Sequence, residues 1–152
     1  MAAADPPPLI GALVRRPMEV VHLRILREAA EAGFTDLVLA HLAVLRYPGP
    51  NGRRPSELAA EVGMTKQAMN YLLGQLEGLG YVERRDDPDD QRSKRVDMTA
   101  RGEELRAVIR RTVMTIEDEL EAELGSTAYS QLRKLLVRLN ESDTIRGEPP
   151  TT

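Results

Sequence analysis

One pair of short extended segments interrupts a sequence that is otherwise patterned as helices. After Gly80 the apolar spacing of three or four residues gives way to extended segments at 81–85 and 94–98, joined by the polar, turn-forming stretch 86–91. This pattern predicts a β-hairpin with a long tip. Because a two-stranded hairpin is not stable alone, it must pack against the helices before it. The sequence therefore predicts a mainly α fold with one small β-hairpin.

Helical patterns precede and follow the hairpin. The predicted helices span about residues 9–16, 17–32, 35–46, 55–62, 65–79, 99–124 and 126–143. Pro17 is expected to stop or kink the first helix and to begin the second. Thr35 or Asp36 is expected to cap the third helix, and Thr99 the long one. Gly125 is expected to end that long helix.

The segment 55–72 has the pattern of a helix-turn-helix. Two short helices that cross steeply need a small residue at their contact and a glycine in the turn, and Ala59 and Gly63 meet these needs. The apolar residues expected on the inner faces are Leu58, Val62, Met64, Met69 and Leu72. An unrelated helical hairpin with these residues by chance is the alternative. With the hairpin behind it, the segment predicts a winged helix-turn-helix.

Polar side chains are expected on the outer face of the second of these helices. On a helical wheel Gln67, Asn70 and Tyr71 point away from the apolar side, and Thr65 and Lys66 stand at the N-terminal end. Gln and Asn can each pair with the edge of adenine through two hydrogen bonds. The N-terminal part of a recognition helix is where base contacts occur. The same residues also fit an ordinary solvated helix face.

A specific motif lies in the predicted hairpin and just after it. The matching residues within 89–102 are Asp90, Arg92, Val96, Met98, Thr99 and Gly102. This spacing resembles the wing signature of the MarR family of transcription regulators, with Met98 in place of the usual leucine. The order and spacing of the family are followed from about residue 34 to 105. The resemblance implies a winged helix-turn-helix with N- and C-terminal dimerisation helices.

The resemblance also implies which residues meet DNA. Arg92 at the wing tip can enter the minor groove while Asp90 holds its guanidinium, although the two can instead form a plain surface ion pair. Residues at the start of the first short helix can hold phosphates. The predicted DNA-binding residues are Arg53, Arg54, Ser56, Thr65, Lys66, Gln67, Asn70, Tyr71, Asp90, Arg92 and Lys94.

Assembly and regulation are expected to follow the family. The resemblance implies a homodimer that binds a near-palindromic double-stranded operator, and a repressor that a small aromatic or anionic effector releases. The effector pocket would lie near the junction of the dimerisation and DNA-binding regions. His22 and His41 are candidates for that pocket, and partly buried structural histidines are the alternative.

Composition removes several other classes of function. Cysteine is absent, so no disulfide, thiolate metal site or thiol switch is possible. The sequence contains no Ser-His-Asp set, no Gly-rich phosphate loop and no metal cluster, and we expect no enzyme activity, cofactor or metal. The net charge of −3 leaves one alternative, a winged helix for protein interaction or dimerisation without DNA binding.

The expected organisation is a single domain between two tails. Residues 1–8 and 147–152 are small, polar or proline-rich and are expected to be disordered. The domain spans 9–146, with the winged core at about 35–98 and dimerisation helices at about 9–32 and 99–143. Apolar stretches are too short to cross a bilayer, and we expect a cytoplasmic protein.

Overall fold

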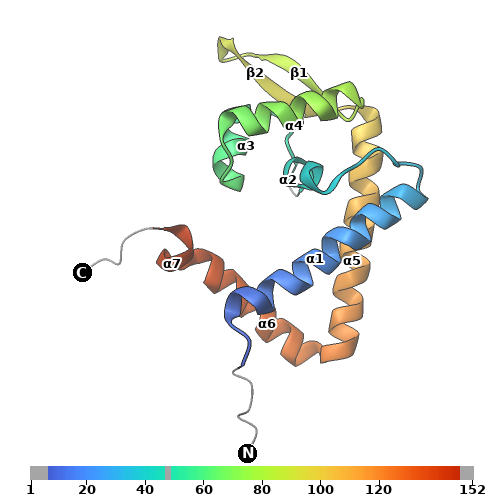
Figure 1. Cartoon of the computed structure of the whole chain (residues 1–152), viewed down its shortest axis with the longest axis vertical. Helices are drawn as coiled ribbons and strands as arrows, with labels where there is room; N and C mark the ends of the chain where they lie inside the picture. The colour runs from blue at the N-terminus through green and yellow to red at the C-terminus, as the bar shows by residue number, and fades with distance from the viewer. Residues whose placement is uncertain (1–6, 47–48, 148–152) are drawn as a thin grey trace, which may run out of the picture. The chain divides into compact units, whose positions relative to one another are not determined.

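The structure is a computed structural model that describes residues 7–46 and 49–147. The two tails predicted to be disordered lie almost entirely outside the described residues. The elements are α1 (Ile10–Glu31), the 3-10 helix η1 (Leu39–His41), α2 (Leu42–Leu45), α3 (Pro55–Val62), α4 (Lys66–Gly78), β1 (Val82–Asp87), β2 (Asp90–Met98), α5 (Ala100–Leu124), α6 (Ser126–Glu141) and α7 (Asp143–Arg146) (Figure 1). The mainly helical fold with one antiparallel hairpin is confirmed. The chain divides into two units, Met1–Val113 and Met114–Thr152.

Helix α1 runs through the position where the sequence predicted a stop. Pro17 lies inside the 22-residue helix, so the prediction of two separate helices is wrong. Proline lacks the N–H that would bond to the carbonyl of Leu13. The loss of this one hydrogen bond does not end the helix, because the residues on both sides keep their helical backbone hydrogen bonds.

The segment between α1 and α3 is also less helical than predicted. In place of one helix from residue 35, the structure has only η1 and α2. Asp36 is not available as a cap, because its carboxylate accepts hydrogen bonds from the Tyr81 hydroxyl and from Arg101. Nδ1 of His41 accepts a hydrogen bond from the Val38 N–H at 3.2 Å, and this contact closes the tight turn that begins η1.

The helix-turn-helix is formed by α3 and α4 as predicted. Gly63 adopts the left-handed conformation (φ 68°) at the end of α3, and the N–H of Met64 donates to the carbonyl of Ala59 at 2.9 Å. Thr65 then caps α4, since its hydroxyl accepts a hydrogen bond from the Ala68 N–H at 3.1 Å. The turn is therefore fixed by bonds from both helices.

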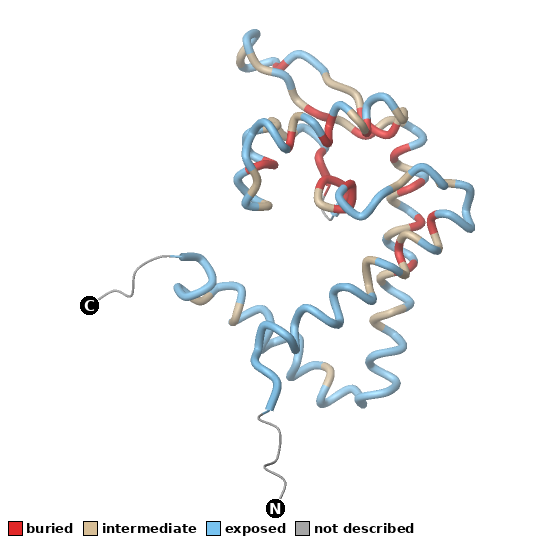
Figure 2. The backbone as a smooth tube through the Cα atoms, in the orientation of Figure 1, coloured by how far each residue is buried: buried red, intermediate tan, exposed pale blue. Residues whose placement is uncertain are grey.

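The core of the first unit lies where the helices meet the hairpin. Its buried members are Ala29, Val44, Leu45, Leu58, Ala59, Met69, Leu72, Leu73, Leu76, Tyr81, Val82, Val96, Met98 and Leu105. Figure 2 shows this buried set on α2, on α4 and at the base of the hairpin. The hairpin is thus stabilised by burial against the helices, as its short length requires.

One glycine allows the start of α5 to lie close to the backbone just before the hairpin. A Cβ added to Gly102 would lie 2.0 Å from the backbone oxygen of Tyr81. That oxygen also accepts a hydrogen bond from the N–H of Thr99. The hydroxyl of Thr99 accepts from the Gly102 N–H at 3.1 Å and caps α5, as the sequence predicted.

The second unit contains the end of α5 together with α6 and α7. None of the residues of α6 is buried in the single chain. Its exposed large apolar residues are Leu132, Leu135, Leu136 and Val137. An ion pair of 2.8 Å joins Arg133 to Glu117 within this unit. In the described part of the chain, no helix combines the length and the apolarity that a membrane crossing requires.

Candidate nucleic-acid interface

Helix α4 has one buried face and one open face. Its buried residues are Met69, Leu72, Leu73 and Leu76. Thr65, Lys66 and Gln67 are exposed at its N-terminal end. Tyr71 is 68% exposed, and its hydroxyl accepts a hydrogen bond from Gln75 at 3.1 Å. The structure therefore places these four predicted site residues on an open surface.

Asn70 differs from its neighbours on that face because it is half-buried. Arg84 on β1 donates from Nη1 to Oδ1 of Asn70 at 3.3 Å and from Nη2 to its backbone oxygen at 3.2 Å. The Nε of Arg84 lies 3.4 Å from a carboxylate oxygen of Glu77. Sequence reasoning missed this contact, because nothing local shows that residues 70 and 84 meet.

The two strands of the hairpin remain paired further towards the tip than the sequence predicted. Strand residues pair from Val82 with Met98 to Asp87 with Asp90. Only Pro88 and Asp89 form the turn, so the prediction of a long tip is wrong. The polar stretch continues the strands because its acidic side chains find partners within the hairpin and on α3.

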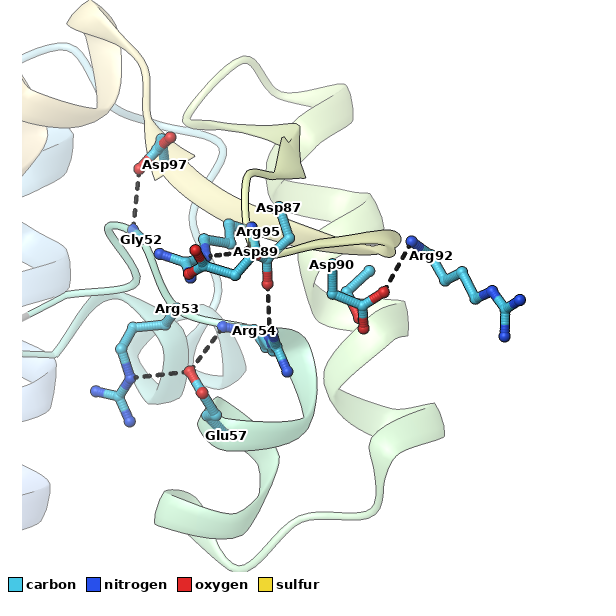
Figure 3. Close-up of polar contacts among 11 residues, drawn as sticks. Gly52, Arg53, Arg54, Glu57, Asp87, Asp89, Asp90, Arg92, Arg95 and Asp97 are labelled. Atoms are coloured by element: carbon cyan, nitrogen blue, oxygen red, sulfur yellow. Dashed lines mark hydrogen bonds and ion pairs between the residues drawn. The ribbon is translucent and has the colours of Figure 1, made fainter.

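Asp87 is the most important of these acidic residues. Its side chain is fully buried, and it forms ion pairs with Arg54 (2.6 Å) and Arg95 (2.9 Å). It also accepts a hydrogen bond from the Asp89 N–H at 3.0 Å (Figure 3). That backbone bond, together with the two guanidinium groups, lowers the pKa of Asp87 to about 2 despite its burial. Asp87 thereby joins the turn to the start of α3.

The segment before α3 forms one isolated β-bridge with the hairpin, between Arg53 and Val96. The N–H of Val96 donates to the carbonyl of Arg53, and the N–H of Gly52 donates to the carbonyl of Val96, both at 2.9 Å. The Gly52 N–H also meets a carboxylate oxygen of Asp97 at 2.9 Å (Figure 3). β2 is thus held from both sides, a feature that the sequence reasoning did not find.

The two arginines predicted to hold phosphates already have protein partners. Arg53 pairs with Glu61 at 2.7 Å and with Glu57 at 3.6 Å, and Arg54 pairs with Asp87. The hydrogen bond from Arg53 is the main cause of a lowered pKa at Glu61. Ser56 is exposed in the first turn of α3. Both guanidinium groups therefore contribute to holding α3 in place.

Arg92 is the exception among the basic residues of the hairpin. Arg84, Arg85, Lys94 and Arg95 each form an ion pair. Arg92 is exposed, and its guanidinium has no partner among the described residues; Figure 3 shows it pointing away from the cluster.

The predicted pairing of Asp90 with the Arg92 guanidinium is wrong. Asp90 instead accepts hydrogen bonds from the Arg92 backbone N–H at 3.0 Å and from the Ser93 hydroxyl at 2.9 Å. The carboxylate thus bonds to groups two and three residues further along the chain, a local contact that aspartate readily makes beside a turn. Asp90 fixes the backbone at Arg92 and leaves the charged end free.

Comparison with known proteins agrees with this geometry. The model of the MarR family matches residues 32–93, which include the helix-turn-helix and the tip of the hairpin. The crystal structure of MarR superposes with a TM-score of 0.74 and 26% identity, covering 95% of this chain and 97% of that one. Over this region the chain is similar to the MarR family.

Further known proteins are similar over most of the chain. Transcriptional repressor MprA of Escherichia coli (strain K12) is 26% identical over 115 residues, which are 73% of this chain and 65% of MprA. Transcriptional repressor CouR bound to a 23-mer DNA duplex has a TM-score of 0.66 and 27% identity, over 86% of this chain and 92% of that one. A Mycobacterium tuberculosis MarR family protein in complex with salicylic acid has a TM-score of 0.63 and 28% identity, over 90% and 99%.

The two histidines of this chain differ in their surroundings. His41 is buried, with Nδ1 accepting from the Val38 N–H and Nε2 lying 3.2 Å from the side-chain oxygen of Gln75. Both ring nitrogens of His41 therefore have partners within the protein. His22 is half-buried on α1. Within the described residues, no group of three or more His, Cys, Asp or Glu side chains is arranged to hold a metal ion.

Proposed function

We propose that this protein is a homodimeric, sequence-specific DNA-binding transcription regulator, a repressor that a small molecule releases from its operator. One observation carries the proposal. The open N-terminal turn of α4 presents polar side chains, and the adjoining hairpin presents Arg92, whose guanidinium has no partner in the described part of the protein. A polar helix end beside a free arginine suits a major groove and the minor groove next to it.

The relatives support this function. MprA is a transcriptional repressor, and CouR is a repressor whose structure contains a DNA duplex. The salicylic acid complex of the Mycobacterium tuberculosis protein supports a small, anionic aromatic effector. A protein-interaction winged helix would be expected to carry apolar anchors at its wing, whereas the exposed tip residues here are polar apart from Pro88.

Each candidate residue takes a role that its surroundings allow. Gln67 and Asn70 read base edges in the major groove. Arg92 enters the minor groove, with Asp90 fixing the backbone that carries it. The residues proposed to contact phosphates or to border the bases are Ser56, Thr65, Lys66, Tyr71 and Lys94. Arg54 acts mainly by fixing the start of α3 to the hairpin through Asp87, and Arg53 by pairing with Glu61 of α3.

Dimerisation is proposed through the terminal helices. Helix α1 exposes apolar residues at its N-terminal end, and α6 exposes its own apolar set. The residues are Ile10, Leu13, Val14 and Met18 on α1, and Leu132, Leu135, Leu136 and Val137 on α6. A two-fold dimer places two recognition helices in successive major grooves and selects a near-palindrome with half-sites about 10 base pairs apart.

The effector site is proposed near α1, with His22 as a candidate contact. His41 is a weaker candidate because both of its ring nitrogens have protein partners. An effector weakens DNA binding only if it binds the DNA-free arrangement of the dimer more tightly than the DNA-bound one.

A selection experiment tests the function directly. The full-length protein is incubated with a library of random DNA duplexes, and the bound duplexes are amplified and sequenced over several rounds. We expect a near-palindromic sequence to be enriched. A library that stays random after repeated rounds, with the protein folded, contradicts the proposal and favours the protein-interaction module.

A further inference from the structure

We propose that Arg84 is a positioning residue that sets the base preference of this protein at the base pair read by Asn70. The inference rests on the proposed function and names a determinant of specificity within that same site. It assigns to Arg84 a role other than phosphate contact.

The geometry places the guanidinium between the hairpin and the recognition helix. Arg84 contacts Asn70 twice, at the side-chain oxygen (3.3 Å) and at the backbone oxygen (3.2 Å). Its third nitrogen pairs with Glu77 at 3.4 Å. The Arg84 side chain is 27% exposed. Both terminal nitrogens thus donate to Asn70 on α4, and Nε lies at ion-pair distance from Glu77 without a hydrogen bond. The two bonds to Asn70 hold the guanidinium against the helix.

The contact with Arg84 determines which end of the Asn70 amide is free. The two ends of an asparagine amide have nearly the same shape but opposite hydrogen-bonding character. Arginine has only donors, so the end of Asn70 that faces Arg84 must be the oxygen. The NH₂ end is the one turned away from the guanidinium, and no partner for it is present among the described residues. The protein therefore decides which end of the amide is free for DNA.

Base preference follows from that choice. A fixed NH₂ group pairs with acceptors in the major groove, which are N7 and O6 of guanine, N7 of adenine and O4 of thymine. An amide that is free to flip presents either a donor or an acceptor and tolerates more bases. Loss of Arg84 should therefore reduce discrimination at this one base pair while leaving the other positions unchanged.

The test measures discrimination at every position of the selected operator. Affinities are determined for the preferred duplex and for each single base-pair substitution, with the wild type and with Asn70→Ala, Arg84→Met, Arg84→Lys and Arg85→Met. Arg85→Met is the matched control, because it removes the same charge from the next residue, whose guanidinium contacts Glu83 and Asp97 instead. Thermal melting checks that each variant is folded.

We expect Asn70→Ala and Arg84→Met to lose discrimination at the same base pair, each by about tenfold. A double variant that combines Asn70→Ala with Arg84→Met should lose no more discrimination at this base pair than either single variant. Arg84→Lys keeps the charge without the two-pronged contact and should lose discrimination in part, and it decides the question if Arg84→Met does not fold. Arg85→Met should leave the base preferences unchanged.

Three results would overturn the inference. In the first, Arg84→Met and Arg84→Lys retain full discrimination where Asn70→Ala loses it. In the second, Asn70→Ala loses none at any position. In the third, Arg84→Met weakens binding to all duplexes equally, to the same extent as Arg85→Met, which would mean that Arg84 contributes only its charge. In each of these cases the wild type still selects an operator and the proposed function stands. A wild type that prefers no duplex overturns the proposed function as well.

Discussion

Nε of Arg54 lies 2.6 Å from a carboxylate oxygen of Asp87, whose side chain has no exposed surface. The two residues are 33 positions apart and join the start of α3 to the turn of the hairpin. Because the isolated hairpin would be unstable, this contact helps to determine where its tip, and with it Arg92, stands beside the helix-turn-helix.

Acid should weaken the fold through Asp87. The pKa of Asp87 in the folded protein is about 2, below its ordinary value of 3.8, chiefly because of the hydrogen bond from Asp89. A lowered pKa means that the stabilisation is present above about pH 4 and is lost as the pH falls from there towards 2. We expect thermal melting temperatures of the wild type to fall more steeply over this range than those of Asp87→Asn.

The control for this experiment is Asp86→Asn. The Asp86 side chain is 77% exposed, so its replacement should leave the wild-type pH profile in place. If the melting temperatures of the wild type and Asp87→Asn fall with pH to the same extent, the buried carboxylate does not contribute to acid sensitivity.

Two helical glycines should respond in opposite ways to alanine. Gly102→Ala places a methyl group 2.0 Å from the Tyr81 carbonyl oxygen, and we expect a loss of about 2 kcal/mol in the free energy of unfolding. Apart from the adjacent backbone of its own helix, Gly74 has no atom of the described protein within 4 Å of an added Cβ, so Gly74→Ala should gain up to about 1 kcal/mol from helix propensity. Chemical denaturation measures both. Equal effects in the two variants would mean that α5 does not approach Tyr81 as closely as the structure has it.

Arg92 should contribute charge to DNA binding without base selection. Arg92→Ala is expected to weaken binding to most duplexes alike and to reduce the slope of log affinity against log salt by about one unit per wing, or two per dimer. Arg85→Ala is the comparison, because Arg85 is already paired with Glu83 and Asp97. If the two variants have the same salt slope as the wild type, the wing is not a DNA contact.

The local parts of the fold were predictable and the long-range side-chain contacts were not. The α3–α4 turn follows from Ala59 and Gly63, which are four residues apart. The contacts between Arg84 and Asn70 and between Arg54 and Asp87 join residues 14 and 33 positions apart. A sequence pattern shows which residues are polar, but the partner of each depends on how the elements pack.

In the candidate site, too, local features were predictable and long-range contacts were not. The wheel of α4 correctly placed Gln67 and Tyr71 on the open face, since helix geometry alone determines that. Asp87 was predicted to lie in a polar loop, because a carboxylate without visible partners is normally exposed. Its burial depends on two arginines from other segments, and only the folded structure brings them together.

Charge on the apolar face of α6 should disrupt the proposed dimer. Leu135 is 59% exposed in the single chain, and Leu135→Glu would bury a carboxylate in an apolar interface. We expect sedimentation velocity to show a dimer for the wild type and a shift towards monomer for this variant. Gln131→Glu adds the same charge at an exposed polar position of α6 and should remain dimeric. A wild type that sediments as a folded monomer at micromolar concentration contradicts the proposed assembly.

The central claim is that α4 and the hairpin recognise a DNA sequence. Its most direct test is the ratio of affinities for the selected operator and for a scrambled duplex of the same composition, measured by fluorescence anisotropy at two salt concentrations with the wild type and Gln67→Ala. We expect the wild type to prefer the operator at both salt concentrations, and Gln67→Ala to lose about 1–3 kcal/mol of discrimination at one base pair in each half-site. Equal affinity of the wild type for the two duplexes, decreasing with salt to the same extent, would contradict the claim.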